Sequence, residues 1–207
     1  KNNSPLILLD LPSLQSFSIM KTSINEIIDE IFALYERFGN ADYIGEPVSQ
    51  LEHMSQAAQL AMKEGFDDQV VLAAFFHDIG HICVMQNESN SMDGYGVKSH
   101  EKIGSDFLRE RGFPERVTKL VENHVQAKRY LTYKYPEYYQ SLSQASKRTL
   151  EFQGGIMAAQ EAEAFEGDVL FDVSIRMRKW EELAKEIDVA LIDLAKIKSK
   201  VRNVLLQ

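Results

Sequence analysis

The sequence has only one cysteine, one tryptophan and five prolines among its 207 residues. A single cysteine, Cys83, excludes an internal disulfide and fits a protein from a reducing compartment. Its apolar neighbours Ile82 and Val84 favour a packed thiol over a nucleophile. No run approaches the ~20 consecutive apolar residues that a membrane span requires. We therefore expect a cytoplasmic protein without a transmembrane helix.

Positive charge is also scarce. Against 31 acidic residues the chain has 23 lysines and arginines, giving a formal net charge of -8, and it contains no long basic run. Nucleic acids and anionic membranes bind clustered positive charge, so neither is an expected partner. A small anionic substrate would need a local basic pocket in this acidic protein.

The length and the 44% hydrophobic content fit one domain with its own core. We expect residues 20–207 to form this domain and residues 1–19 to be a loosely attached extension without an assigned function. The apolar stretch 6–9 is interrupted by Asp10 and Pro12, and it lacks the layout of a signal peptide.

Apolar residues recur at spacings of three and four through most of the chain, which predicts an all-α fold. Residues 70–76 are almost entirely apolar and predict a central helix. Two or three more helices are expected after Ser143, with a break at residues 154–155. Before residue 130, helices are predicted to start near Met20, Ser49, Asp67 or Asp68, His100 and Pro114.

Two other segments are interpreted by composition. Residues 86–96 are polar and contain glycine, which predicts a loop that could act as a lid. The tyrosine-rich residues 130–139 contain too few basic residues for a base-stacking surface, so we expect packing and surface roles there.

The histidines are the most informative feature of the chain. All five form one spaced series, His53, His77, His81, His100 and His124, and Asp78 directly follows the second. Any one of them could be an ordinary core or surface residue, but the whole set favours a metal site. Imidazole and carboxylate ligands without thiolates favour iron or manganese over structural zinc. Lys128 lies one helical turn after His124, so both side chains should point into the same cavity.

His53, the His77-Asp78 pair and the later histidines resemble the HD-domain metalloproteins, helical bundles best known as phosphohydrolases. A closer similarity rests on residues 42–53 (DYIGEPVSQLEH), residues 77–81 (HDIGH) and the late blocks 154–155 and 176–180 (RMRKW). These segments resemble the di-iron HD oxygenases that cleave the carbon-phosphorus bond of 2-amino-1-hydroxyethylphosphonate. Those enzymes are relatives of myo-inositol oxygenase and use a mixed-valent Fe²⁺/Fe³⁺ pair. The resemblance extends from about residue 43 to residue 185.

The resemblance implies an HD-domain bundle and a role for each matching residue. One iron would be held by His53, His77, Asp78 and a late carboxylate, and Asp78 would bridge to a second iron held by His100 and His124. Tyr43 would close the open position of the second iron until substrate displaces it. Glu46 would receive the substrate ammonium group. The residues implied to bind the phosphonate are His81, Lys128, Ser146, Thr149 and Arg178.

The chain departs from the family pattern at the late carboxylate. The oxygenases have aspartate directly after the tryptophan, whereas Trp180 is followed here by Glu181 and Glu182. Glutamate can bind a hard metal ion, but its extra methylene requires the helix to lie slightly farther from the metals.

The chemistry of the side chains also supports a phosphonate pocket, with simpler alternatives open. A phosphonate dianion needs cationic donors, which Lys128 and Arg178 can supply. Both could instead be solvated helix charges, and Tyr43 and Glu46 could be an ordinary loop tyrosine and a first-turn helix acid. The hydroxyls of residues 146 and 149 could simply cap helices, and Trp180 is expected to be a core anchor.

Three functions are compatible with these residues. The first is a di-iron oxygenase that converts a small α-hydroxy aminoalkylphosphonate and dioxygen into phosphate and a carboxylic acid, glycine for the aminoethyl substrate. The alternative is a metal-dependent phosphohydrolase acting on a small phosphate ester or nucleotide, which needs a metal-bound water where Tyr43 would sit. The third is a non-catalytic, metal-stabilised binding module. We expect the oxygenase.

Overall fold

The computed structural model describes residues 23–43, 45–84 and 89–207, and all regular structure in these segments is helical. Two isolated bridges, Asp42 with Ser49 and Ser91 with Val97, are the only β-type pairings there. The all-α prediction is confirmed. The proposed extension, residues 1–19, lies outside the described residues. None of the described helices combines the length and apolarity needed to cross a membrane.

The predicted helices before residue 143 begin close to their predicted starts, but a short 3-10 helix after Asp78 and a short helix in the tyrosine-rich stretch were not predicted. They are α1 (Ile24–Phe38), α2 (Gln50–Lys63), α3 (Asp68–Phe76), the 3-10 helix η1 (Ile79–His81), α4 (His100–Glu110), α5 (Glu115–Lys134) and α6 (Pro136–Ser141).

The prediction of two or three helices after Ser143 was wrong, because the described chain has four there. They are α7 (Gln144–Phe152), α8 (Ala159–Glu166), α9 (Phe171–Leu183) and α10 (Leu194–Leu205). α7 buries only Leu150, and α8 buries only Ala162 and Phe165. So few buried positions give too short a periodic signal to separate two neighbouring helices.

Side-chain caps fix the starts of the helices that lead to the histidines. Ser49 and Glu52 form the predicted capping box of α2, in which the Glu52 carboxylate accepts a 2.6 Å hydrogen bond from the Ser49 backbone N–H. Asp67, rather than Asp68, caps α3 by accepting a 3.1 Å bond from the Val70 backbone N–H. These caps set where each helix begins and therefore which face carries each histidine.

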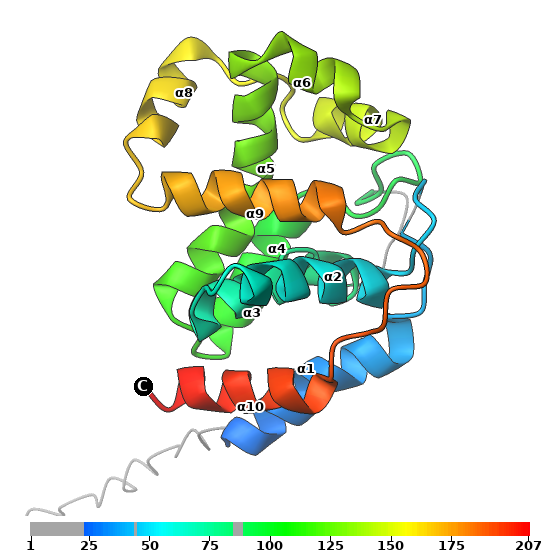
Figure 1. Ribbon diagram of the computed structural model, residues 1–207, viewed down its shortest axis with the longest axis vertical. Helices are drawn as coiled ribbons and strands as arrows, with labels where there is room; N and C mark the ends of the chain where they lie inside the picture. Colours follow the sequence, from blue (N-terminus) through cyan, green and yellow to red (C-terminus); the bar gives the residue numbers. More distant parts are fainter. Residues whose placement is uncertain (1–22, 44, 85–88) are drawn as a thin grey trace, which may run out of the picture.

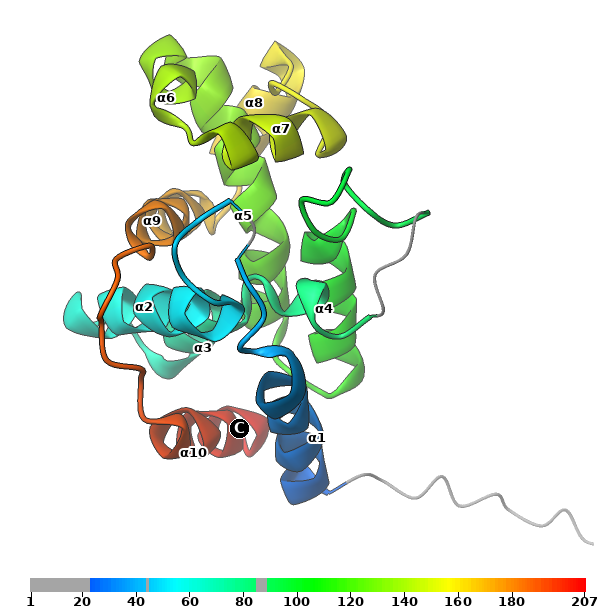
Figure 2. The same cartoon turned by 90° about the vertical axis from the view of Figure 1, so that its right-hand side faces the viewer.

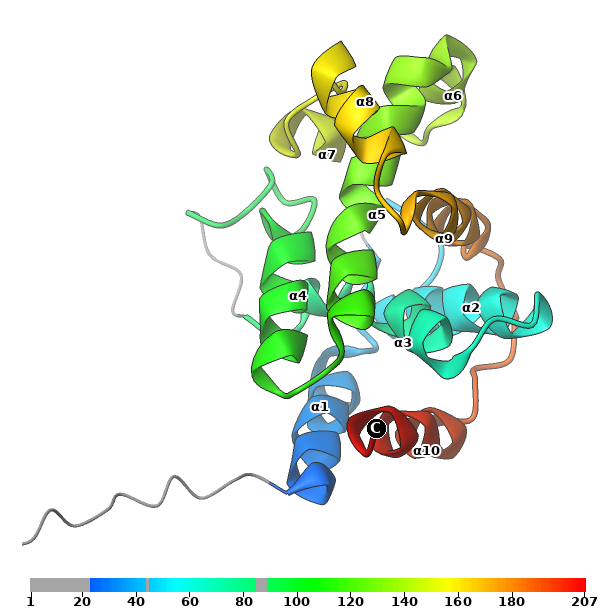
Figure 3. The same ribbon diagram turned by 90° about the vertical axis from the view of Figure 1, so that its left-hand side faces the viewer.

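The 20-residue helix α5 runs through the middle of the molecule and contacts α3, α4, α6, α8 and α9. Figure 1 shows α6, α7 and α8 at one end of the molecule and α1 with α10 at the other. Figures 2 and 3 show α4 lying alongside α5, while α2, α3 and α9 lie on another side of it. The helices that carry the histidines therefore meet in the middle third of the molecule.

The main core is centred on α3. Every residue from 70 to 76 is buried, which confirms that α3 is the central helix, and it packs against α2, α5, α9 and α10. Burying a Leu or Phe side chain contributes about 2 kcal/mol, so this helix is firmly held. A smaller, separate apolar cluster includes Tyr130 of α5 and Phe165 of α8. Cys83 is partly buried, and burial raises its pKa to about 11.

Candidate metal centre

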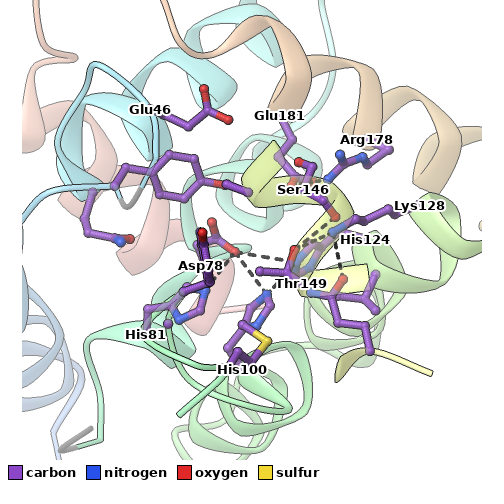
Figure 4. A pocket seen from close by; sticks show the side chains of 18 residues that line it. Glu46, Asp78, His81, His100, His124, Lys128, Ser146, Thr149, Arg178 and Glu181 are labelled. Atoms are coloured by element: carbon purple, nitrogen blue, oxygen red, sulfur yellow. Dashed lines mark hydrogen bonds and ion pairs between the residues drawn. The ribbon is translucent and has the colours of Figure 1, made fainter. Parts of the chain in front are cut away.

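Asp78 lies between two pairs of histidines. Its Oδ2 atom is 3.6 Å from Nε2 of His53 and 3.4 Å from Nε2 of His77, and its Oδ1 atom is 3.3 Å from Nε2 of His100 and 3.5 Å from Nε2 of His124. These residues come from α2, the end of α3, the start of α4 and the middle of α5. The spaced series predicted from the sequence thus converges on one carboxylate, part of which is drawn in Figure 4.

The histidine rings of the two pairs are all oriented in the same way. Each donates its Nδ1–H to a backbone carbonyl oxygen, and the Nε2 atoms within each pair are 3.1 and 3.0 Å apart. The Nδ1 bonds run from His53 to Ala184, from His77 to Ala74, from His100 to Val97 and from His124 to Val121, at 2.8, 2.8, 3.2 and 2.6 Å.

When the rings are neutral, this tautomer leaves an Nε2 lone pair on each, so two lone pairs face each other at about hydrogen-bond distance in each pair. Such an arrangement is repulsive unless a proton or a metal cation lies between the two nitrogens. Without a metal, burial opposes protonation, but the Asp78 carboxylate outweighs it, raising the pKa of His77 to about 9 and also raising that of His100, so these rings take up the proton. Metal-binding histidines commonly donate their other ring N–H to a carbonyl in this way. Two nitrogens bonded to one ion at about 2.1 Å and at right angles are also about 3 Å apart. The donor set therefore fits metal ions.

The charges in the cluster are suited to a cation. Burial lowers the pKa of His53 to about 4 and that of His124 to about 3, so both rings are neutral at pH 7. Burial disfavours the Asp78 carboxylate, but the charge of His77 and the hydrogen bond from His100 outweigh it and hold the Asp78 pKa well below its usual range. Asp78 is therefore a buried anion surrounded by nitrogen donors.

Glu181 provides a second buried carboxylate, only 7% exposed. Its Oε1 atom accepts a hydrogen bond from Arg178 Nη1, while Oε2 is buried with no hydrogen-bond partner among the described residues. Burial opposes ionisation, but Arg178 and His124 outweigh it and lower the Glu181 pKa to about 2. A buried carboxylate oxygen without a partner is costly, and a bound cation would satisfy it. Glu181 thus fits the late carboxylate predicted from the sequence.

His81 differs from the other four histidines. Its Nδ1 accepts a 3.0 Å hydrogen bond from the Val97 backbone N–H, so the proton of the neutral ring is on Nε2. Nε2 lies 4.0 Å from Asp78 Oδ1, and burial lowers the His81 pKa to about 3. The ring also stacks on His100, with centroids 4.0 Å apart. His81 therefore presents an N–H donor, which suits an anionic substrate better than a metal.

Gly80 allows the two halves of the cluster to approach each other. A Cβ atom at this position would lie 2.0 Å from the backbone carbonyl oxygen of His100. A side chain there would push α4 away from η1, and His100 would move away from Asp78. The glycine in the HDIGH motif is therefore required by close backbone contact.

A pocket with a cavity volume of about 50 Å³ adjoins the cluster and is lined by all six predicted substrate residues. The predicted shared cavity of His124 and Lys128 is confirmed, since both side chains line it. The substrate residues that line the pocket are Glu46, His81, Lys128, Ser146, Thr149 and Arg178, drawn together in Figure 4. The predicted loop contributes Met92, Tyr95 and Gly96 to the same wall, and residues 85–88 lie outside the described chain.

Lys128 is a buried cation rather than a solvated helix charge. The residue is 3% exposed, and its Nζ atom donates to Thr149 Oγ1 at 2.7 Å and to Gln153 Oε1 at 2.9 Å. Burial and the nearby Arg178 lower its pKa to about 7. Ser143, not Ser146 or Thr149, caps α7, and the Thr149 hydroxyl instead accepts from Lys128 and donates to the Ser146 carbonyl oxygen at 3.2 Å.

Arg178 is also buried, at 1% exposure, but its charge is already paired. Besides Glu181, it contacts Glu182 Oε1 at 3.1 Å and the Tyr138 hydroxyl at 2.8 Å. It therefore holds Glu181 in place as well as lining the pocket. Trp180, at 1% exposure, is the expected core anchor.

Tyr43 and Glu46 lie in the loop before α2, so Glu46 is not a first-turn helix acid. The Tyr43 ring stacks on His53 with centroids 4.0 Å apart, and both loop residues line the pocket. Burial, followed by the charge of Asp78, raises the Tyr43 pKa well above its usual value. Glu46 Oε1 lies 2.6 Å from Lys185 Nζ. The metal role predicted for Tyr43 and the ammonium role predicted for Glu46 stay predictions.

Sequence reasoning missed three polar residues near the pocket. Gln50 lines it from the first turn of α2, and its buried Oε1 has no partner among the described residues. Its position one helical turn before His53 was a usable signal. Gln153 binds Lys128 from the end of α7, and Lys185 binds Glu46 from beyond α9, and no local pattern marks either residue.

A helical bundle in which one buried aspartate separates two histidine pairs, next to a pocket with a buried lysine, is the arrangement of a metal-binding protein. The family model of the HD domain matches residues 50–168, and the chain belongs to this family. The matched segment contains all five histidines and Asp78 but ends before Glu181.

Proteins that are similar in sequence narrow the class of protein further. The chain is 37% identical over 175 residues to the glycine-betaine-forming [1-hydroxy-2-(trimethylamino)ethyl]phosphonate dioxygenase of Leisingera caerulea, covering 84% of this chain and 88% of the relative. It is 32% identical over 197 residues to the hydroxymethylphosphonate dioxygenase of Gimesia maris, covering 95% and 96%. An uncharacterized protein of Acanthamoeba polyphaga mimivirus is 45% identical over 158 residues, 76% of this chain and 72% of the relative. The resemblance to HD-family phosphonate oxygenases is confirmed.

Proposed function

We propose that this protein is a di-iron oxygenase that cleaves the carbon-phosphorus bond of a small α-hydroxyalkylphosphonate. The observation that carries the proposal is the placement of Asp78 between two histidine pairs whose Nε2 atoms face each other, beside a pocket that contains the buried Lys128. Two relatives that match most of the chain are phosphonate dioxygenases. The substrate and one dioxygen give a carboxylic acid and phosphate, which together contain two more oxygen atoms than the substrate.

The ligand residues divide into two sets that share Asp78. His53, His77 and Glu181 would complete one iron site, and His100 and His124 the other. Imidazole and carboxylate donors suit iron. The bound irons would supply Lewis acidity towards the hydroxyl and phosphonate oxygens and the electrons that activate dioxygen.

The protein's own residues bind and orient the substrate. Lys128, fixed by Thr149 and Gln153, donates charge-assisted hydrogen bonds to the phosphonate, and the His81 Nε2–H donates from the opposite wall. The Tyr43 ring covers His53 and helps to keep water away from the reacting carbon. The family resemblance implies an aminoalkyl substrate with glycine as product, and the Glu46–Lys185 contact bears on that choice.

The test is oxygen-dependent phosphate release. The protein is loaded with ferrous iron without air and is then given dioxygen with a panel of α-hydroxyphosphonates, while phosphate and oxygen uptake are measured. We expect one phosphate per dioxygen consumed. Asp78→Asn should lose at least about 100-fold in rate together with bound iron, since it removes the shared ligand. Asp106→Asn, which changes an acid on the outer side of α4, is the matched control.

Other outcomes would point to the rival functions. Phosphate release from a phosphate ester or nucleotide without oxygen uptake would support a phosphohydrolase. Iron retention with tight phosphonate binding but no turnover would support a binding module.

A further inference from the structure

Glu46 already has a cationic partner inside the protein. Lys185 Nζ lies 2.6 Å from Glu46 Oε1, and the two side chains are only 20% and 12% exposed. Charged pairs this close and this well shielded from water interact far more strongly than surface pairs. The carboxylate that faces the pocket is therefore neutralised before any substrate enters.

The backbone on both sides of Lys185 is fixed to α2. The carbonyl oxygen of Ala184 accepts the Nδ1–H of His53 at 2.8 Å. The backbone of Glu186 makes two bonds with the side-chain amide of Gln56, accepting at 2.9 Å and donating at 3.1 Å. Lys185 is thus held between two anchored neighbours and approaches Glu46 from a defined position, unlike a lysine on a free loop.

No other carboxylate of the described pocket is available to a substrate cation. Besides Glu46, the carboxylates that line it are Asp78, which lies among the histidines, and Glu181, which is bound by Arg178. A substrate ammonium group would have to displace Lys185 from Glu46 or lie beside its positive charge. Either outcome disfavours a cationic substituent.

We propose that Lys185 is a specificity-determining residue that makes this enzyme prefer α-hydroxyphosphonates without a cationic substituent, such as hydroxymethylphosphonate. This inference rests on the proposed function and names the substrate class of the same site. Both substrate types occur among the relatives, since one is named for a trimethylamino substrate and another for hydroxymethylphosphonate. The cavity of about 50 Å³ also suits a one-carbon substrate better than a trimethylammonium group.

The experiment compares three substrates: hydroxymethylphosphonate, 2-amino-1-hydroxyethylphosphonate and its trimethylammonium analogue. For the iron-loaded enzyme we expect kcat/KM for hydroxymethylphosphonate to exceed that for both cationic substrates by at least about 10-fold. Lys185→Met frees Glu46 and should raise the ratio of cationic to neutral kcat/KM by at least about 10-fold. In a Glu46→Gln background the same substitution should give no such gain.

Lys196→Met is the matched control, because it removes the same charge from an exposed position on α10 and should leave the ratio unchanged. A wild-type enzyme that prefers the cationic substrates, or a Lys185→Met ratio equal to that of the wild type, would overturn the proposal.

Binding separates this inference from the proposed function. Kd for the three phosphonates is measured by calorimetry on the iron-loaded protein without air. If no substrate is turned over but hydroxymethylphosphonate binds most tightly and Lys185→Met reverses the order, the oxygenase function is wrong and the role of Lys185 stands. Equal Kd values for all three substrates, or no binding of any, would overturn the role of Lys185.

Discussion

The five histidine rings fall into two groups according to which backbone atom each ring contacts. Four rings donate Nδ1–H to carbonyl oxygens and direct Nε2 towards the Asp78 carboxylate. His81 instead accepts from the Val97 N–H and presents a proton to the pocket. The backbone thus fixes which ring nitrogen carries the proton, which suits four rings to the proposed metal site and His81 to the proposed substrate contact.

The first residue-scale prediction concerns the contact that positions His81. Gly96 has φ of 106°, and a Cβ atom there would lie 2.6 Å from Cε1 of the His81 ring. Gly96→Ala should displace the ring and raise KM for the phosphonate about 10-fold, the factor that one weakened hydrogen bond gives. Iron content, measured by elemental analysis, should not change, because His81 is not one of the proposed iron ligands.

Gly94→Ala is the matched control for backbone strain. Gly94 also has a positive φ, of 86°, but a Cβ atom there would meet nothing within 4 Å. It should therefore cost stability without raising KM. An equal rise in KM for both variants would mean that strain in the loop, and not the His81 contact, causes the effect.

The second residue-scale prediction concerns the cost of burying Lys128. Its pKa is lowered by burial, and by Arg178, from 10.5 to about 7. Between about pH 7 and pH 10.5, Lys128 is protonated in the unfolded chain but not in the folded protein. The free energy of unfolding of the wild type therefore rises as pH increases through this range. Below pH 7 it bears the full cost of the buried charge. Lys128→Met removes this dependence.

The measured quantity is the free energy of unfolding of Lys128→Met minus that of the wild type. This difference should be about 2 to 3 kcal/mol larger at pH 6 than at pH 9. Urea denaturation of both proteins at both pH values measures this difference. Lys196→Met, at an exposed site, should show no such change. A pH-independent difference for Lys128→Met would show that the lysine is not desolvated as the pocket geometry implies.

Histidine spacing predicted the cluster because each ligand lies on or directly beside a helix whose period and cap are visible in the sequence. The tautomer of His81 could not be predicted, because it depends on the backbone of Val97, 16 residues away. The partner of Glu46 could not be predicted either, since Lys185 lies 139 residues farther along the chain. Local patterns place side chains on elements, whereas such pairings depend on how distant elements pack.

At the scale of elements, α9 connects the pocket to the core. One face carries Arg178 and Glu181 towards the metal cluster, and the same helix carries Trp180 into the main core. The end of α2 is joined to this helix through Glu64, which binds Arg176 at 2.5 and 2.6 Å and the Trp180 Nε1–H at 2.9 Å. The position of Glu181 therefore depends on how α9 packs against α2.

The prediction at the scale of elements concerns the loss of the Glu64 contacts between α2 and α9. Glu64→Ala leaves the buried Trp180 N–H without its acceptor and should lower the free energy of unfolding by about 1 to 3 kcal/mol. Glu64→Gln keeps an acceptor oxygen for Trp180 and should cost less. Urea denaturation of the two variants tests this order. A Gln variant as unstable as the Ala variant would mean that the ion pair with Arg176, and not the Trp180 bond, joins the helices.

Helices with both a cap and a long apolar face were predictable, as α2 and α3 show. Those that bury one or two side chains, such as α7 and α8, were not resolved as separate helices, although α7 supplies Ser146 and Thr149 to the pocket. These two residues were assigned from the family resemblance. Part of the pocket is thus built from elements whose own sequence signal is weak.

At the scale of the whole molecule, the helix that stabilises the core from outside and the residues of the binding site contact different parts of α3. Its C-terminal end leads into His77 and Asp78, whereas α10 packs against it and against α1. None of the residues that line the described pocket belongs to α10. A substitution on α10 can therefore weaken the core without changing the geometry of the histidines around Asp78.

This separation gives the last prediction. Ile197 on α10 is fully buried in the main core, so Ile197→Ala should lower the free energy of unfolding by about 2 to 5 kcal/mol through lost burial and a new cavity. KM and the iron content of the folded protein, measured well below the unfolding temperature, should match the wild type. Ser199→Ala, at an exposed position on the same helix, should change none of these quantities. Loss of iron in Ile197→Ala at temperatures where the protein is folded would show instead that α3 transmits packing changes to its histidine, and that the core and the metal cluster form one cooperative unit.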